Sequence, residues 1–219
     1  MYQHHYDDGQ LIDLPVGKVV CVGRNYLDHI QELNNEVPEQ PLLFIKPNTA
    51  LCDVQQPIAI PKGKGSCHNE LEIAILIGKQ LTDCDDDTAK RGIHGVGLGL
   101  DLTLREVQDA LKAKGQPWER AKGFDASCPI SPFVPIDKVA IERNIEFSLL
   151  VNNIVRQQGN SANMMHNISS LIVDISKNFT LLPGDIVLTG TPKGVGPLQD
   201  GDELSLVLKG HLSIKTKVT

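Results

Sequence analysis

The sequence has few aromatic residues, no excess of positive charge and no long apolar run, and each shortage excludes a class of protein. Aromatic residues make up 4% of the 219, and the net charge is -6 with a pI near 5.6. Nucleic-acid-binding domains need a basic surface and, for single strands, aromatic platforms, so we expect no nucleic-acid partner. No segment reaches the roughly 18 apolar residues that span a bilayer, so we expect no membrane partner.

Cysteine usage and the N-terminus bear on the compartment. The five cysteines are odd in number and scattered, without a C-x-x-C pair, and the N-terminus lacks the apolar segment of a signal peptide. This usage is typical of reduced thiols, so we expect a cytoplasmic protein. The densest basic region is interrupted by Glu119 on a helical pattern, which predicts a solvent-exposed face for most of its members: Lys112, Lys114, Arg120 and Lys122.

The length and the 41% hydrophobic content fit one domain over residues 1–219, with residues 1–17 as an N-terminal edge segment. We count roughly three helices among ten or more short strands. That ratio favours an α+β fold that is predominantly β over an array of βαβ units. Two hairpins are expected, one about Asn152-Asn153 and one about Lys209-Gly210, because both pairs accept tight turns.

Local signals fix several further expectations. Asn25 is a plausible N-cap of a short helix that runs to about Leu33. Thr103 to Glu106 has the spacing of a capping box, which predicts that a helix opens there. Residues 116–135 are expected to form a loop, and a loop of that length usually carries function.

Two acids lie inside the most hydrophobic segment of the chain, His68 to Gly78. Strand side chains alternate between faces, so Glu70 and Glu72 point the same way, with Cα atoms roughly 7 Å apart. Two half-buried carboxylates without a partner destabilise a fold, and a hard divalent cation is the simplest way to keep both ionised. The alternative, which the spacing alone leaves open, is a solvent-facing edge strand with two harmless glutamates.

Asp101 supplies a possible third ligand. It follows the glycine-rich strand that starts at Gly95, a segment that lacks the G-x-G-x-x-G spacing of a dinucleotide-binding turn. Three carboxylates would leave open positions around Mg²⁺, or Mn²⁺, for water or substrate. Zinc fits less well, because no His or Cys pair has ligand spacing.

From Lys18 to Val218 the chain resembles the fumarylacetoacetate hydrolase family, close to its short acylpyruvase-type members. The resemblance rests on the order of several motifs, which include Gly23-Arg24-Asn25-Tyr26 with His29 and Glu32, Phe44-Ile45-Lys46-Pro47, Glu70-Leu71-Glu72, Asp101, Gln108, Lys122-Gly123-Phe124-Asp125, Cys128-Pro129 and Gly190-Thr191-Pro192-Lys193-Gly194-Val195-Gly196. It implies a mixed β-sandwich roll with a few short helices, a bound magnesium ion and a homodimer.

The resemblance also implies roles for individual residues. Glu70, Glu72 and Asp101 match the metal ligands. His29 and Glu32 match a catalytic dyad, and Lys122 a further catalytic group. The positions that match substrate-binding groups are Arg24, Asn25, Lys46, Gln108 and Thr191. Taken alone, a histidine three residues from a glutamate is usually only a hydrogen-bonded pair.

The expected activity is metal-dependent hydrolysis of a carbon–carbon bond in an acylpyruvate, such as fumarylpyruvate or acetylpyruvate. The products would be pyruvate and a carboxylic acid. The dyad favours hydrolysis, because it can activate water and decarboxylation needs no base. The alternatives are an oxaloacetate decarboxylase, an isomerase or decarboxylase of unsaturated 2-oxo acids, and a non-catalytic protein that binds a metal or a small 2-oxo acid.

Overall fold

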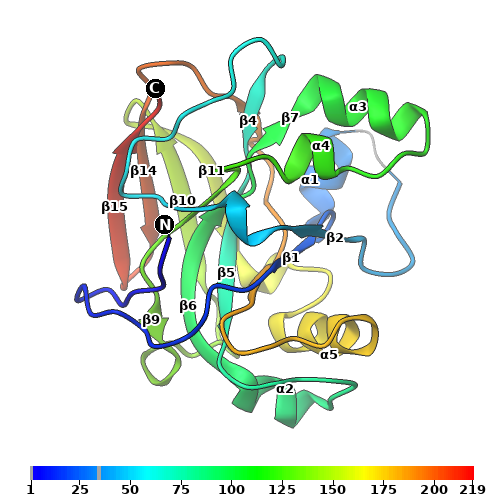
Figure 1. Ribbon diagram of the computed structural model, residues 1–219, viewed down its shortest axis with the longest axis vertical. Helices are drawn as coiled ribbons and strands as arrows, with labels where there is room; N and C mark the ends of the chain where they lie inside the picture. The colour runs from blue at the N-terminus through cyan, green and yellow to red at the C-terminus, as the bar shows by residue number, and fades with distance from the viewer. Residues whose placement is uncertain (1, 34–35) are drawn as a thin grey trace.

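The computed structural model describes residues 2–33 and 36–219, so Met1 of the expected N-terminal segment lies outside them. The described residues form three β-sheets and five short α-helices (Figure 1). The expected α+β architecture, rich in strands and poor in helix, is confirmed. No helix in the described part of the chain is both long and apolar enough to cross a membrane.

The largest sheet has eight strands, in the order β2-β1-β12-β5-β6-β8-β3 with β9 paired to β6. They are β1 (Val19–Val22), β2 (Leu43–Lys46), β3 (Leu51–Asp53), β5 (Leu71–Ile77), β6 (Ile93–Leu100), β8 (Cys128–Ile130), β9 (Val134–Pro135) and β12 (Ile186–Leu188). Strands β5 and β6 pair antiparallel, with Leu71 opposite Leu100. Every residue of β5 is buried, as a continuous apolar run predicts for a strand covered on both faces.

The second sheet has the order β11-β10-β14-β15 and lies along one side of the molecule (Figure 1). Its strands are β10 (Glu146–Val151), β11 (Ile154–Asn160), β14 (Glu203–Leu208) and β15 (Leu212–Lys217). Both expected hairpins are confirmed: Asn152 and Asn153 have φ of 52° and 64°, and Gly210 lies in the turn between β14 and β15. A third, small sheet contains β13 (Gly196–Pro197), β4 (Cys67–Asn69) and β7 (Thr103–Leu104).

The helices gather at two ends of the large sheet (Figure 1). At one end lie α1 (Leu27–Glu32), α3 (Arg105–Ala113) and α4 (Glu119–Lys122); at the other lie α2 (Asp86–Gly92) and α5 (Ile168–Asn178). Single-turn 3-10 helices are η1 (Asn48–Ala50), η2 (Ile136–Lys138) and η3 (Ser161–Asn163). Helix α5 buries Ile168, Leu171 and Ile175, as its apolar period predicts.

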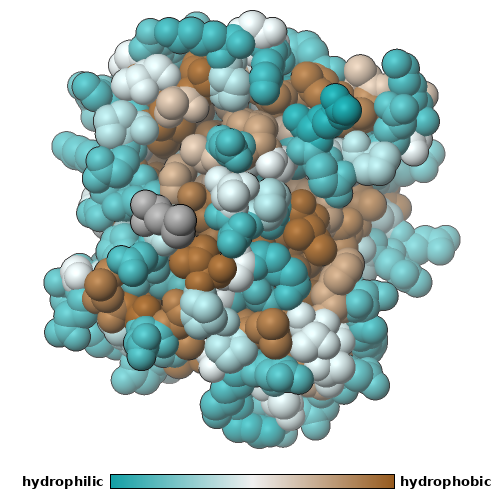
Figure 2. All heavy atoms as spheres, in the orientation of Figure 1, coloured by the Kyte–Doolittle hydropathy of each residue, from teal (hydrophilic) through white to brown (hydrophobic). Residues whose placement is uncertain are grey.

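Hydrophobic side chains fill the space between the large sheet and the second sheet, where Ile73 and Leu98 share one core with Phe147 and Leu206. On the face shown in Figure 2, hydrophobic residues reach the surface in separate patches among hydrophilic ones. The most exposed large ones include Ile154 and Val155 on β11, at the edge of the second sheet. All five cysteines are free thiols.

Three local expectations are wrong. Helix α1 begins at Leu27 with Tyr26 as its N-cap, and no side chain caps it, because the Asn25 amide is engaged elsewhere. The capping box at Thr103 does not form: the Thr103 hydroxyl donates to the Asp101 carbonyl, and Glu106 accepts from Ser66 instead. Residues 116–135 are not one loop, because they fold into α4, β8 and β9.

Candidate active site

Glu70, Glu72 and Asp101 come together beside the paired ends of β5 and β6. Their carboxylate oxygens lie within 4.8 Å of one another, and the three residues are 5%, 1% and 1% exposed. Glu70 precedes β5, Glu72 lies in it, and Asp101 follows β6, so the pairing of Leu71 with Leu100 brings the three side by side. The alternative of a solvent-facing edge strand is excluded. Ligation of a metal by these residues stays a prediction.

Cations surround this carboxylate cluster. The Lys122 ammonium, itself 2% exposed, lies 2.7 Å from Glu70 Oε2 and 2.6 Å from Asp101 Oδ2. Arg105 donates to Glu70 Oε1 from its Nη2. Lys122 therefore does not belong to the solvent-exposed members of the basic region, since α4 turns this side chain inward onto the cluster, and its catalytic role stays a prediction.

The two glutamates differ in their acidity. Burial opposes ionisation of Glu70, but the charges of Lys122 and Arg105 outweigh it and hold the pKa of Glu70 below its usual range. Burial raises the pKa of Glu72, and the neighbouring charges of Asp101 and Glu70 raise it further. Glu70 is therefore held as a carboxylate by its own cations, whereas Glu72 has no cation of its own and faces two other acids.

The donor set fits a divalent cation. Asp101 Oδ1 lies 2.8 Å from Lys46 Nζ in a buried ion pair, but among the described residues no hydrogen bond of good geometry reaches this oxygen, because the Lys46 hydrogen bonds go to backbone carbonyls and to Ser127. A buried carboxylate oxygen that accepts no hydrogen bond of good geometry, beside two other carboxylates, suits a cation ligand. Because all the donors are oxygen atoms, Mg²⁺ and Mn²⁺ suit the cluster better than zinc.

Lys46 was expected to bind substrate, and that role stays a prediction; its contacts also give it a structural role. The side chain is fully buried and bonds the carbonyl oxygens of Lys122 and Ser127. It lies against Asp101 and is satisfied by backbone groups, so it fixes the position of that carboxylate and of α4.

His29 and Glu32 form a pair at the end of α1. His29 Nδ1 and Glu32 Oε2 are 3.1 Å apart, and His29 is 3% exposed. The other carboxylate oxygen of Glu32 accepts from the Gly194 backbone N–H at 2.9 Å. His29 is also among the groups that act electrostatically on Glu70 and lower its pKa, so the pair lies near the carboxylate cluster.

One glycine-rich turn positions both parts of the site. The Gly190 N–H donates to Glu72 Oε2 at 2.6 Å, four residues before the Gly194 N–H reaches Glu32. Both glycines have positive φ, 95° and 98°, which other residues rarely adopt. At Gly194 a Cβ atom would lie 2.0 Å from the Arg156 carbonyl oxygen, so only glycine fits there.

Thr191 and Asn25 are buried and engaged with the backbone. The Thr191 hydroxyl donates to the Leu71 carbonyl at 2.9 Å and accepts from Gln157 Nε2 at 2.8 Å. The Asn25 amide donates to the carbonyls of Thr189 and His166. Both residues tie the turn to its surroundings, and their roles in substrate binding stay predictions.

Two residues that contact the candidate site escaped the sequence analysis. Gln157 is 1% exposed and receives hydrogen bonds from Asn69 Nδ2 and the Leu71 N–H, which locks the turn onto β5. Arg105 joins Glu70 to Gln108, whose Oε1 accepts from Arg105 Nη1 at 2.7 Å. Arg105 could have been found from the sequence, because it lies three residues before Gln108 on one face of a helix that begins shortly after Asp101. Arg24 donates to the Glu36 carbonyl at 2.9 Å, and its role in substrate binding stays a prediction.

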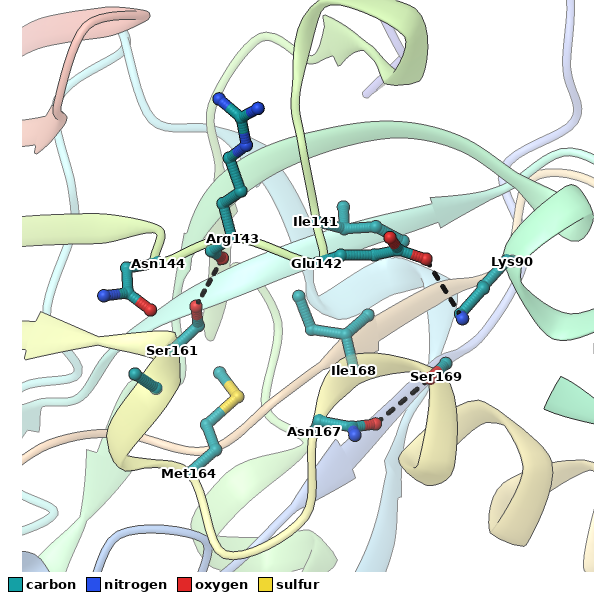
Figure 3. Close-up of a pocket in the computed structure, with 11 residues that line it drawn as sticks. Lys90, Ile141, Glu142, Arg143, Asn144, Ser161, Met164, Asn167, Ile168 and Ser169 are labelled. Carbon is teal, nitrogen blue, oxygen red and sulfur yellow. Dashed lines mark hydrogen bonds and ion pairs between the residues drawn. The ribbon is translucent and has the colours of Figure 1, made fainter. Parts of the chain in front are cut away.

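A separate surface pocket of about 470 Å³ lies between α2, η3 and the start of α5 (Figure 3). Several of its polar groups are already paired: Lys90 with Glu142 at 3.1 Å, and the Ser169 hydroxyl with Asn167 at 3.1 Å. None of the predicted site residues lines it. We therefore do not assign it to the active site.

Comparisons with known proteins place this arrangement in a family. Residues 18–219 match the family model described as Fumarylacetoacetate (FAA) hydrolase C-terminal. The chain is 55% identical to Oxaloacetate tautomerase YcgM of Escherichia coli (strain K12), over all of both chains. It is 42% identical to a mitochondrial oxaloacetate decarboxylase of Dictyostelium discoideum, over 88% of this chain and 89% of that one.

A solved structure extends the likeness to the fold. It is a fumarylpyruvate hydrolase from Pseudomonas aeruginosa in complex with Mn²⁺ and pyruvate, 32% identical with a TM-score of 0.93. The match covers 100% of this chain and 95% of that one.

Proposed function

The chain belongs to the fumarylacetoacetate hydrolase family, and from this premise we propose that it is a divalent-cation-dependent enzyme that converts the enol form of oxaloacetate into the keto form. One observation carries the proposal: a single site holds a carboxylate cluster suited to a cation and a His29–Glu32 pair suited to proton transfer. The relative with 55% identity, named an oxaloacetate tautomerase, supports this choice of substrate.

Tautomerisation moves one proton from the enol oxygen to C3, and the dyad suits both halves of that transfer. When His29 Nδ1 carries the proton shared with Glu32, Nε2 keeps a lone pair. Nε2 accepts the hydroxyl proton and leaves the O–H electron pair on the C2 oxygen as an enolate. This pair then forms the C2=O bond while the electrons of the C2=C3 bond take the proton from Nε2 at C3, so His29 ends as it began.

Negative charge builds up on the C2 oxygen during this transfer. A cation bound by Glu70, Glu72 and Asp101 would supply Lewis-acid polarisation of that oxygen. The Lys122 ammonium, held between Glu70 and Asp101, adds a fixed positive charge beside the same position. Glu32, itself held by Gly194, keeps the imidazole ring in one orientation.

Acylpyruvate hydrolysis, the main expectation from the sequence, becomes the second candidate. The His29–Glu32 dyad favoured hydrolysis over decarboxylation, because decarboxylation needs no base. Tautomerisation needs a base as hydrolysis does, so the dyad does not distinguish hydrolysis from tautomerisation. The geometry of the His29–Glu32 pair and the likeness to a fumarylpyruvate hydrolase support it. Oxaloacetate decarboxylation, supported by the Dictyostelium relative, would use the same positive charge to stabilise the pyruvate enolate.

The test is the loss of enol absorbance from freshly dissolved oxaloacetate, with Mg²⁺, with Mn²⁺ and with EDTA. We expect metal-dependent acceleration that is lost in His29→Gln and kept in His211→Gln, since His211 is exposed on a hairpin turn. Equal rates with EDTA, or an unchanged His29→Gln rate, contradict the proposal. Pyruvate release from oxaloacetate, acetylpyruvate and fumarylpyruvate, coupled to lactate dehydrogenase, separates decarboxylation and hydrolysis from tautomerisation.

We also propose a homodimer and a cytoplasmic location, as the family resemblance and the cysteine usage imply. Ile154 and Val155, 73% and 58% exposed on an edge strand, support a subunit contact. Light scattering should give about twice the 23.9 kDa chain mass, and a mass equal to one chain would exclude the dimer.

A further inference from the structure

Three polar side chains form a row along one face of α3. Arg105, Gln108 and Lys112 are spaced three and four residues apart, and residues with this spacing share a helix face. The row starts at the carboxylate cluster, because Arg105 contacts Glu70. Helical side chains lean toward the N-terminus of the helix, so the stem of Lys112 is directed back along the row toward the cluster.

Two packed aromatic rings, Trp118 and Phe44, lie beside Lys112. Its Nζ lies 5.3 Å from the centroid of the Trp118 ring, which packs against Phe44 with the ring centroids 5.8 Å apart. The other cation beside these rings is Lys122, whose Nζ lies 5.1 Å from the Phe44 centroid. The same pair of rings therefore carries the ammonium of the carboxylate cluster and a second ammonium farther out.

The second ammonium lies among positive charges. Burial lowers the pKa of Lys112, the charges of Arg105 and Arg24 lower it further, and Asp109 and Glu70 oppose them only in part. Within the described residues, no carboxylate forms an ion pair with Lys112. The expectation of a solvent-exposed face is therefore wrong for this residue, which is half-buried and unpaired. A half-buried cation beside two others gains most from an incoming anion.

We propose that Lys112 is a specificity-determining residue that binds the second carboxylate of a dicarboxylic 2-oxo or 2-hydroxy acid. This rests on the proposed function, in which the first carboxylate and the 2-oxygen lie at the carboxylate cluster. Arg105 and Lys112 are about 10 Å apart along the helix axis. Because a helical side chain leans toward the N-terminus, the distance from the Lys112 ammonium to the cluster is shorter than this and compares with the length of a four-carbon diacid. Monoacids such as pyruvate or lactate leave Lys112 without a partner.

Binding of non-reacting ligands tests the proposal without turnover. Malate and lactate both offer a carboxylate and a 2-hydroxyl, and only malate adds a distal carboxylate. Calorimetry on the Mg²⁺-loaded protein should give malate at least about tenfold tighter binding than lactate, as a charge-assisted hydrogen bond provides. Trp118 is the only tryptophan, so malate but not lactate should change its fluorescence when Lys112 turns to the ligand.

Three variants separate charge from packing. Lys112→Met keeps the apolar stem on Trp118 and should remove the malate preference with unchanged lactate affinity. Lys112→Arg should retain most of the preference. Lys114→Met, an exposed lysine two residues on, is the matched control and should match the parent.

A Lys112→Met protein that still prefers malate as the parent does overturns the proposal, as does an equal loss of both ligands or no malate binding at all. The binding test and the turnover test can fail separately. A malate preference without oxaloacetate turnover would refute the proposed reaction and support the role of Lys112. Turnover without the malate preference would support the reaction and refute the role of Lys112.

Discussion

Replacing Lys46 with methionine should destabilise the protein without weakening substrate binding. Methionine keeps the apolar stem but removes the ammonium, which bonds the carbonyls of Lys122 and Ser127 and lies 2.8 Å from Asp101 Oδ1. Breaking a buried charge pair on one side costs about 3–5 kcal/mol. Because Lys122 still pairs with Asp101, we expect the low end, about 3 kcal/mol.

For a chain of this length, that loss lowers Tm by on the order of 6–12 °C. The measurement is thermal unfolding of the metal-free protein, with Lys215→Met, an exposed residue of β15, as the matched control. Saturating Mg²⁺ should recover part of the difference, because a cation would compensate the Asp101 charge. A Tm equal to that of the control, together with a raised KM for oxaloacetate, would refute this reasoning and support Lys46 as a substrate-binding residue.

Further predictions concern the turn, the dyad, the cluster and the N-terminal segment. Gly194→Ala should lower both Tm and kcat, because its Cβ would meet a backbone oxygen at 2.0 Å; unchanged values would show that the turn adapts. Glu32→Gln should lower kcat and change KM little, since the His29 imidazole loses the carboxylate that orients it. Steady-state kinetics in which only KM changes would contradict this. Asp101→Asn should abolish the heat of Mg²⁺ binding in calorimetry, and a titration like that of the parent would show that Asp101 is not a metal ligand. Burial lowers the pKa of His4 below 6.5, so the unfolded chain binds the proton first and Tm should fall as pH drops below about 6.5; His4→Gln should flatten that fall, and an unchanged slope would exclude this residue as the cause.

The periodicity of the sequence predicted the parts of the site that lie on regular structure. Glu70 and Glu72 could be assigned to one face because strand side chains alternate, and Asp101 could be placed at a strand end. Their approach within 4.8 Å depends on the pairing of β5 with β6, which no local pattern encodes. The family resemblance supplied that long-range information.

Interactions between distant segments account for most of the misses. The Thr103–Glu106 spacing fits a capping box, but Glu106 found a partner in Ser66, which lies 40 residues earlier. Lys112 and Lys122 look alike in the sequence, and only the packing of Phe44 and Trp118 shows that neither faces open solvent. Gln157 carried no signal, because its four hydrogen bonds all reach across the chain.

The central claim is that the chain's own base moves the proton of oxaloacetate beside a bound cation. The most direct measurement is the conversion of enol oxaloacetate in D₂O, with the keto product trapped at once by malate dehydrogenase and the label at C3 located by NMR. We predict deuterium at one of the two C3 positions when Mg²⁺ is present, because a fixed His29 delivers it to one face. Label spread equally over both positions, as in the uncatalysed reaction, would contradict the claim.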